Sequence, residues 1–355
     1  MPNVRCKLCM AYIVFFMCGP SASAQPAQIN EWMLLDVREM VHGVAFSADG
    51  KLLAACLNHR TEIWSLTDKS KKCVINDRGT MCFTNQDTEL TVGTYFIEGS
   101  KLKDGERRGT VVRRWDLASG NLSEETKFHD EFAWPLSGAG SVLISRSADS
   151  KKTANVLDLT TRKKVRITAD EDFDSVFMCP QKKTIVSLHT VGEFEAAMRI
   201  WDFPSGKLRH SVALKDPKMY WSRQWDTPGV FSADGRVFQL VFPHNEYELW
   251  DLRTGKPTLT EPHRVGYSRK YLHLFPNGKL VLQGGIPDGD VLIFDAQKRV
   301  DPKKAWEPVA RLHGTKRAIN LPCIAVSADG KLVAQSTSNG TISIWKVPSL
   351  DPAPK

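Results

Sequence analysis

The chain repeats one short phrase at widely separated positions: VAFSADGKLLA begins at Val44, GVFSADGRVFQ at Gly229, IAVSADGKLVA at Ile324 and a looser copy, HLFPNGKLVLQ, at His273. In each copy a turn centred on Ala-Asp-Gly or Pro-Asn-Gly separates two apolar runs. The first two turn residues suit a type I turn, and the glycine takes the positive φ that lets the chain re-enter a strand. Each copy therefore predicts a β-hairpin, whose strands we name a and b.

A second phrase follows each hairpin and predicts a third strand, c. Its copies are TEIWSL, TVVRRWDL, the weaker ANVLDL, MRIWDF, YELWDL, VLIFDA and ISIWKV. A turn and a shorter strand, d, come next, as in KKCVIN from Lys71. One large residue anchors each copy, and the anchors lie 42 to 51 residues apart: Trp64, Trp115, Leu157, Trp201, Trp250, Phe294 and Trp345. This is the period of a four-stranded propeller blade, lengthened in places by insertions.

These units resemble WD40 repeats, most closely in the Trp-Asp pairs at Trp115, Trp201 and Trp250 and in the three Ser-Ala-Asp-Gly turns. The resemblance covers roughly residues 30–350. It implies an all-β fold, a seven-bladed β-propeller of four-stranded antiparallel blades. The chain departs from the family in the buried His–Ser–Asp–Trp network: His313 and Trp345 could fill two of its places in the last unit, but Asn339 stands where an Asp is expected.

The last unit lacks a fourth strand of its own. After strand c the chain reads PSLDPAPK, and its three prolines cannot supply a paired strand. EWMLLDV, at residues 31–37, precedes the first unit and has no blade. We expect this N-terminal segment to join the last blade as its d strand and to close the ring. Closure would pair strand edges that are otherwise open to aggregation.

The first 24 residues have the composition of a secretory signal peptide. Arg5 and Lys7 precede an apolar stretch that ends at Gly19, and Ala22 and Ala24 offer a cleavage site before Gln25. The stretch is too short to cross a bilayer, which needs about 20 apolar residues. A retained anchor or a lipidated Cys18 are the alternatives. We therefore expect a signal peptide at 1–24, a propeller at 25–347, a Pro-rich tail at 348–355, and an exported protein, periplasmic or extracellular, that meets a membrane only during translocation.

Charge and cysteine content narrow the class of partner only slightly. Removal of Arg5 and Lys7 with the leader lowers the formal net charge from +8 to +6, which is mildly basic and leaves no clear nucleic-acid footprint. The cysteines that follow the leader are Cys56, Cys73, Cys82, Cys179 and Cys323, an odd set with irregular spacing. Export permits a disulfide, but the sequence names no pair.

The segments that would line the central channel carry few reactive groups. They read GVAFS, TMCFT, FAWPL, SVFMC, GVFSA, YLHLF and CIAVS, and apart from thiols only His273 titrates near neutral pH. The chain also lacks the common hydrolase, metalloprotease and phosphate-loop motifs. The sequence thus favours a protein that is not an enzyme and needs neither cofactor nor metal. The alternative is a propeller enzyme, such as a lactonase-like hydrolase, with its site at the channel mouth.

The long connections offer a better candidate site. Connections d–a and b–c share one end of such a ring, and those in this chain combine aromatic with basic residues, the usual content of interface hot spots. The candidates are Tyr220, Trp221, Arg223, Trp225, Arg264, Arg269, Lys270, Lys316 and Arg317. They predict a docking surface for an acidic partner protein, and hence a non-catalytic scaffold. The alternative is that the tryptophans are core anchors and the charges are merely solvated.

Overall fold

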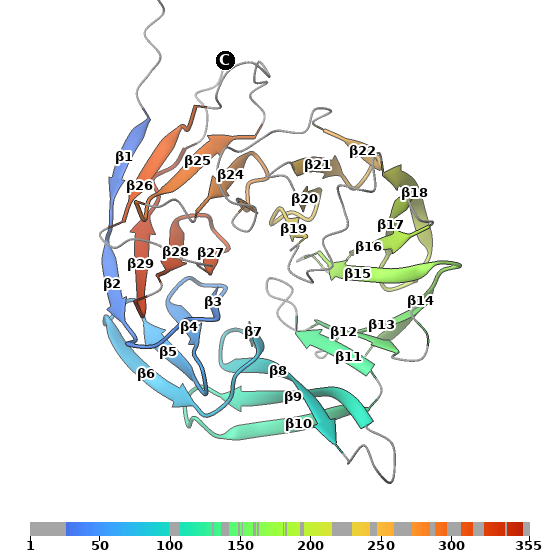
Figure 1. Cartoon of the computed structure of the whole chain (residues 1–355), viewed down its shortest axis with the longest axis horizontal. Coiled ribbons are helices and arrows are strands. Elements are labelled where there is room, and N and C mark those ends of the chain that lie inside the picture. Colours follow the sequence, from blue (N-terminus) through green and yellow to red (C-terminus); the bar gives the residue numbers. More distant parts are fainter. Residues whose placement is uncertain are drawn as a thin grey trace, which may run out of the picture.

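The computed structural model is a ring of seven β-sheets around a central axis (Figure 1). It describes residues 26–98, 107–129, 131–135, 142–147, 150, 152–158, 161, 163–179, 181, 183–191, 195–214, 229–241, 247–258, 272–284, 288–296, 307–314, 323–337 and 339–350. Within these ranges every regular element is a strand, so none of them is a helix that could cross a membrane.

The first four blades follow the chain in order, each running a–b–c–d from the axis outward. Blade one contains β3 (Gly43–Phe46), β4 (Leu52–Cys56), β5 (Thr61–Ser65) and β6 (Ser70–Ile75). Blade two contains β7 (Thr80–Thr84), β8 (Glu89–Glu98), β9 (Arg107–Asp116) and β10 (Leu122–His129). Blade three contains β11 (Glu131–Pro135), β12 (Val142–Ser147), β13 (Thr153–Asp158) and β14 (Lys164–Thr168). Blade four contains β15 (Asp172–Met178), β16 (Thr184–Thr190), β17 (Ala196–Asp202) and β18 (Leu208–Leu214).

The remaining blades complete the predicted seven. Blade five contains β19 (Val230–Phe231), β20 (Val237–Val241), β21 (Tyr247–Asp251) and β22 (Lys256–Pro257). Blade six contains β23 (Leu272–Leu274), β24 (Leu280–Gln283), β25 (Val291–Asp295) and β26 (Ala310–His313). Blade seven contains β27 (Ile324–Val326), β28 (Leu332–Ser336), β29 (Thr341–Lys346) and β2 (Met33–Asp36). The predicted fold class is therefore confirmed.

The repeated turn has one geometry in its three Ser-Ala-Asp-Gly copies. In blade one Ser47 Oγ accepts from the amide of Leu52 at 2.9 Å and donates to Asp49 Oδ1 at 2.7 Å, and Gly50 has φ +69°. The same bonds recur at Ser232–Asp234 and Ser327–Asp329. Each hydroxyl thus ties the start of the turn to the start of strand b, which explains the Ser-x-Asp spacing.

The glycines of these turns also let neighbouring blades approach. A Cβ placed on Gly278 in blade six would lie 3.2 Å from Ser232 in blade five, and one on Gly235 would lie 3.3 Å from Cys179 in blade four. Positive φ and a close neighbour both disfavour a side chain here. The turns therefore pack one against the next at one end of the ring.

The ring closes as the sequence predicts, through the N-terminal segment. Strand β2 pairs antiparallel with β29, with Met33 opposite Ile344 and Asp36 opposite Thr341. The chain after β2 stays close, because the amide of Val37 donates to the carbonyl of Gly340 at 2.9 Å. A Cβ on Gly340 would lie 2.8 Å from the backbone of Arg38, so only glycine permits this approach.

The same segment also contacts blade six, which the sequence did not predict. Strand β1 (Ala27–Asn30) pairs parallel with β26, from Ala27 opposite Ala310 to Asn30 opposite His313. It makes the sheet of blade six five-stranded. One straight segment can do this because β26 is a d strand and β29 a c strand, and the two run in opposite directions. Figure 1 shows β1 and β2, in blue, along the outer edge of the red blades.

Burial follows the position of each strand in its blade. The middle strands are covered on both faces: in β4 Leu52 is half-buried and the four residues that follow it are buried. The outer strands alternate: in β14 Val165 and Ile167 are buried, and the other three residues are exposed. Blades stacked face to face account for the continuous apolar runs of the middle strands.

Candidate functional site

The nine predicted docking residues all lie outside the described residues. Tyr220, Trp221, Arg223 and Trp225 fall between β18 and β19, and Arg264, Arg269 and Lys270 fall between β22 and β23. Lys316 and Arg317 fall between β26 and β27. The docking surface therefore stays a prediction at the level of side chains.

The topology describes only the strands at which these segments begin and end. Each segment follows the outer strand of one blade and precedes the inner strand of the next. Because strands alternate in direction, the last residues of these outer strands and the first residues of the next inner strands lie at the same end of the ring as the end of β8 and the start of β9. We call this the insertion end, and the end that carries the Ser-Ala-Asp-Gly turns the turn end.

The central channel shows a structural role for its one predicted titratable group. His273 lies on the inner strand β23, and its Nδ1 is 2.9 Å from the carbonyl oxygen of Leu274. Burial lowers the pKa of this imidazole, so it is neutral at pH 7. In the described part of the chain, no three His, Cys, Asp or Glu side chains gather in a way that could hold a metal ion.

The anchor tryptophans bond differently from one blade to the next. Trp345 Nε1 donates to the backbone carbonyl of His313 at 2.8 Å, while the His313 ring faces Asp290 at 3.4 Å. Asn339 instead bonds the hydroxyl of Thr341 at 3.1 Å. The expected departure of the last unit from the family network is thus seen in its hydrogen bonds.

Blade four contains a buried polar network that the sequence analysis missed. Trp201 Nε1 donates to Ser187 Oγ at 2.8 Å, and Ser187 Oγ lies 2.7 Å from His189 Nε2. An indole N–H only donates, so the Ser187 hydroxyl accepts from Trp201, and the same oxygen bonds the imidazole of His189. The pattern is hard to recognise because His189 lies on strand b.

His189 makes stability depend on pH in a predictable direction. Burial, helped by the charge of Arg199, lowers the pKa of His189 from 6.5 to about 4. The unfolded chain takes up a proton near pH 6.5, whereas the folded chain resists it until about pH 4. The contribution of neutral His189 to the free energy of unfolding should therefore be complete above pH 6.5, and it should fall by up to about 3 kcal/mol as the pH drops towards 4. Urea unfolding of wild type and His189→Phe at several pH values measures this, because their difference should shrink as pH falls. A constant difference from pH 7.5 to pH 4 would contradict it.

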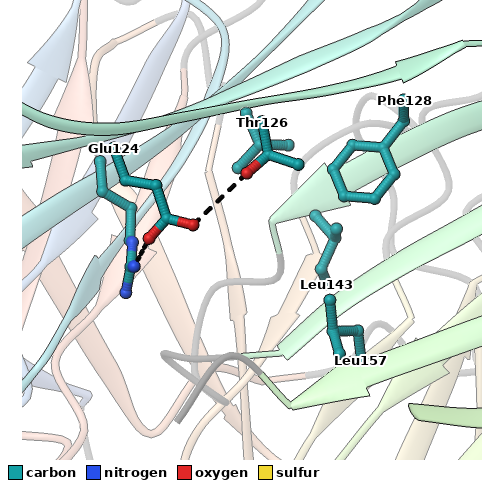
Figure 2. Close-up of a pocket in the computed structure, with 7 residues that line it drawn as sticks. Glu124, Thr126, Phe128, Leu143 and Leu157 are labelled. Carbon is teal, nitrogen blue, oxygen red and sulfur yellow. Dashed lines mark hydrogen bonds and ion pairs between the residues drawn. The ribbon is translucent and has the colours of Figure 1, made fainter. Parts of the chain in front are cut away.

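A cleft opens between blades two and three, at the position of the exceptional anchor Leu157 (Figure 2). The volume that water could occupy in it is about 40 Å³, and the empty space reaches about 320 Å³ only when open solvent at its mouth is counted. Val112, Leu143 and Leu157 contribute aliphatic lining, and Phe128 covers another side. The apolar cluster at this interface has only two buried members, Val112 and Leu143, among the described residues.

The polar side of the cleft comes from the two outer strands of blade two. Arg114 on β9 forms an ion pair with Glu124 on β10, and Thr126 Oγ1 is 3.4 Å from Glu124 Oε1. Glu124, Thr126 and Phe128 alternate along β10 and therefore share the face that looks toward blade three. The arrangement offers an apolar slot with hydrogen-bond acceptors at one side. The sequence signal for it was the leucine in the weaker phrase ANVLDL.

Comparison with known families identifies one repeat. Residues 306–346 match the family model described as WD domain, G-beta repeat. This stretch covers the outer strand of blade six and the inner three strands of blade seven. A search of curated proteins finds no match to the chain. The repeat match and the seven-bladed ring together support a resemblance of this propeller to WD40-repeat proteins.

Proposed function

We propose that this chain is a WD40-type propeller that acts as a non-catalytic, protein-binding scaffold through its insertion end. The observation that carries the proposal is the sorting of connections in the closed ring. Short turns, tied by Ser and Asp side chains, occupy the turn end, while the described strands that flank the three long outer-to-inner connections meet these connections at the insertion end. Variable loops held by a rigid scaffold are the usual location of binding sites.

The partner proposed for this end is an acidic protein. The three long connections contain six basic candidates, Arg223, Arg264, Arg269, Lys270, Lys316 and Arg317, and three aromatic ones. Aromatic rings supply contact area, and arginines supply charge-assisted hydrogen bonds to carboxylates. Charge complementarity of this kind mainly raises the association rate and selects the partner.

Charge reversal at the insertion end tests the scaffold. Proteins that the chain beginning at Gln25 captures from an extract are identified, and binding of each is measured again with Arg264→Glu, Arg269→Glu and Arg317→Glu combined. We expect the affinity for acidic partners to fall at least about tenfold and to become less dependent on salt.

A matched control changes the same number of charges at the turn end. Lys51, Arg236 and Lys331 have side chains that are 71%, 80% and 78% exposed. Their combined reversal to Glu should leave binding unchanged, because their ion pairs at the surface contribute little. Equal binding of all partners by the two triple variants and the wild type would refute an insertion-end docking surface.

We also propose that the protein is exported after removal of residues 1–24. The support is the basic head, the apolar stretch and the small residues before Gln25. Mass spectrometry of the N-terminal peptide from producing cells decides this, because an intact Met1 on the folded protein would refute cleavage.

A further inference from the structure

The seven anchors occupy equivalent positions, because each pairs directly with a buried residue of strand b. Leu53 lies opposite Trp64, Ile185 opposite Trp201, and Val333 opposite Trp345. Pairs at the same register in blades two, five and six are Leu90–Trp115, Phe238–Trp250 and Val281–Phe294. Blade three has Leu143 opposite Leu157. An aromatic ring is therefore present at this position in six blades and absent in the third.

Where the ring is present, it fills the interface with the preceding blade. Trp250 of blade five packs in one cluster with Met198 and Ile200 of blade four. Trp345 of blade seven packs with Leu282 and Ile293 of blade six in the same way. By equivalence, a ring at position 157 would lie against blade two. That is where the cleft opens between Leu157 and Val112.

Three of the equivalent indoles donate to an acceptor side chain. The acceptors are Asp77, just before blade two, at 3.3 Å, Ser187 in blade four at 2.8 Å and Glu248 in blade five at 3.1 Å, whereas the buried N–H of Trp64 has no hydrogen-bond partner among the described residues. In the cleft the Thr126 hydroxyl and the Glu124 carboxylate supply the same types of acceptor oxygen. A hydroxyl that donates to a carboxylate still has lone pairs for an incoming N–H.

The mouth of the cleft adjoins a strand suited to bind a polypeptide. Strand β10 forms the outer edge of blade two, with the sheet order β10-β9-β8-β7. At blade six the chain itself shows the corresponding addition, since the extended segment β1 pairs with the outer strand β26. An extended segment of a partner that pairs along β10 would carry its side chains to the cleft mouth. The side chains of Arg114 and Glu124 are 22% and 32% exposed, so the mouth reaches solvent.

We propose that the cleft between blades two and three binds a tryptophan side chain of a partner polypeptide, which takes the place of the absent anchor ring. This inference rests on the proposed scaffold function and adds a second contact site to it. The indole fills the space over Leu143 and Leu157, and its N–H donates to Thr126 or Glu124. The site selects a flat apolar ring with one donor, and it disfavours aliphatic side chains, which leave the acceptors without an N–H.

Titration calorimetry with two probes tests the site in the purified chain beginning at Gln25. The probes are 3-methylindole, which is the tryptophan side chain alone, and a blocked Gly-Trp-Gly peptide. We expect both to bind with a Kd below about 1 mM, because burial of an indole ring can supply the binding free energy that this Kd requires. Thr126→Val should weaken 3-methylindole at least about threefold and leave naphthalene, which has no N–H, unchanged.

Two variants at position 157 separate a binding site from a packing gap. Leu157→Trp supplies the missing ring, and it should raise Tm by about 2 °C and abolish binding of both probes. Leu157→Met conserves volume and should keep binding. Leu157→Phe replaces the tryptophan variant if that protein does not fold.

Each result has one meaning for the proposal. Failure of both probes to bind, or equal binding to wild type and Leu157→Trp, would overturn the site. Binding of 3-methylindole without the peptide would overturn a polypeptide as the ligand in favour of a free indole. None of these measurements uses the partner or the insertion end, so the scaffold function can fail or hold independently.

Discussion

Replacing Leu35 by aspartate is expected to unfold most of the ring under conditions in which the wild type is stable. Leu35 is 4% exposed, pairs with Ile342 across the closing sheet, and packs in one cluster with Leu53 and Ile344. The change removes a buried aliphatic side chain and places a charge among apolar neighbours. Together these cost more than about 4 kcal/mol, a large part of the stability of a typical domain.

The size of this effect comes from the position of Leu35 in the ring as well as from its burial. Strand β2 joins residues 33–36 to residues 341–344, so it ties one end of the chain to the other. Without this pairing the last blade loses its outer strand, and β29 becomes an edge. Deletion of residues 31–37 should therefore be at least as damaging as the point substitution.

Leu34 provides the matched control on the same strand. Its side chain points outward and is 39% exposed, so Leu34→Asp should change the free energy of unfolding by no more than about 0.5 kcal/mol. Urea unfolding followed by circular dichroism measures the free energy of unfolding of the wild type, Leu35→Asp and Leu34→Asp. A midpoint for Leu35→Asp that equals that of Leu34→Asp would show that the N-terminal strand does not close the ring.

The second large effect is expected from Trp345→Ala in blade seven. Trp345 is fully buried at 0% exposure and fills the interface between blades six and seven. Truncation leaves a cavity among well-packed neighbours and removes the N–H bond to the carbonyl of His313. The free energy of unfolding should fall by about 4 kcal/mol. Trp345→Phe keeps a ring and should cost less than Trp345→Ala, because it leaves a smaller cavity.

Lys331→Ala serves as the control in the same blade, since the Lys331 side chain is 78% exposed. It should be nearly neutral. Thermal and urea unfolding measure the stability of all three variants. Removal of an aromatic ring from blade seven should destabilise the protein, whereas its addition to blade three in Leu157→Trp should stabilise it. A cost for Trp345→Ala below about 1 kcal/mol would contradict the view that anchors wedge the blades together.

Local features of the chain were enough to predict the ring. The Ser-Ala-Asp-Gly phrase specifies its own turn through bonds between residues two to five apart, such as those of Ser47. One anchor per unit gives the blade count, and the apolar segment before the first hairpin provides the closing strand. These signals work because strand period and turn chemistry depend on neighbours in sequence.

Contacts between blades could not be predicted from the sequence and were revealed only by the tertiary structure. The polar segment AQIN carries no strand pattern, and it becomes β1 only because β26 presents an edge beside it. The Trp201–Ser187–His189 network needs strands b and c in register, which no spacing in the sequence specifies. In the sequence Leu157 is only a weak copy of the anchor. The structure shows, from the residues of blade two that face it, that an aromatic ring is absent at this position. The sequence by itself thus determined the seven units, their turns and their closure, because these follow from local chemistry. The tertiary structure decided the second pairing of the N-terminal segment, the buried histidine and the cleft, because each depends on which side chains of separate blades face one another.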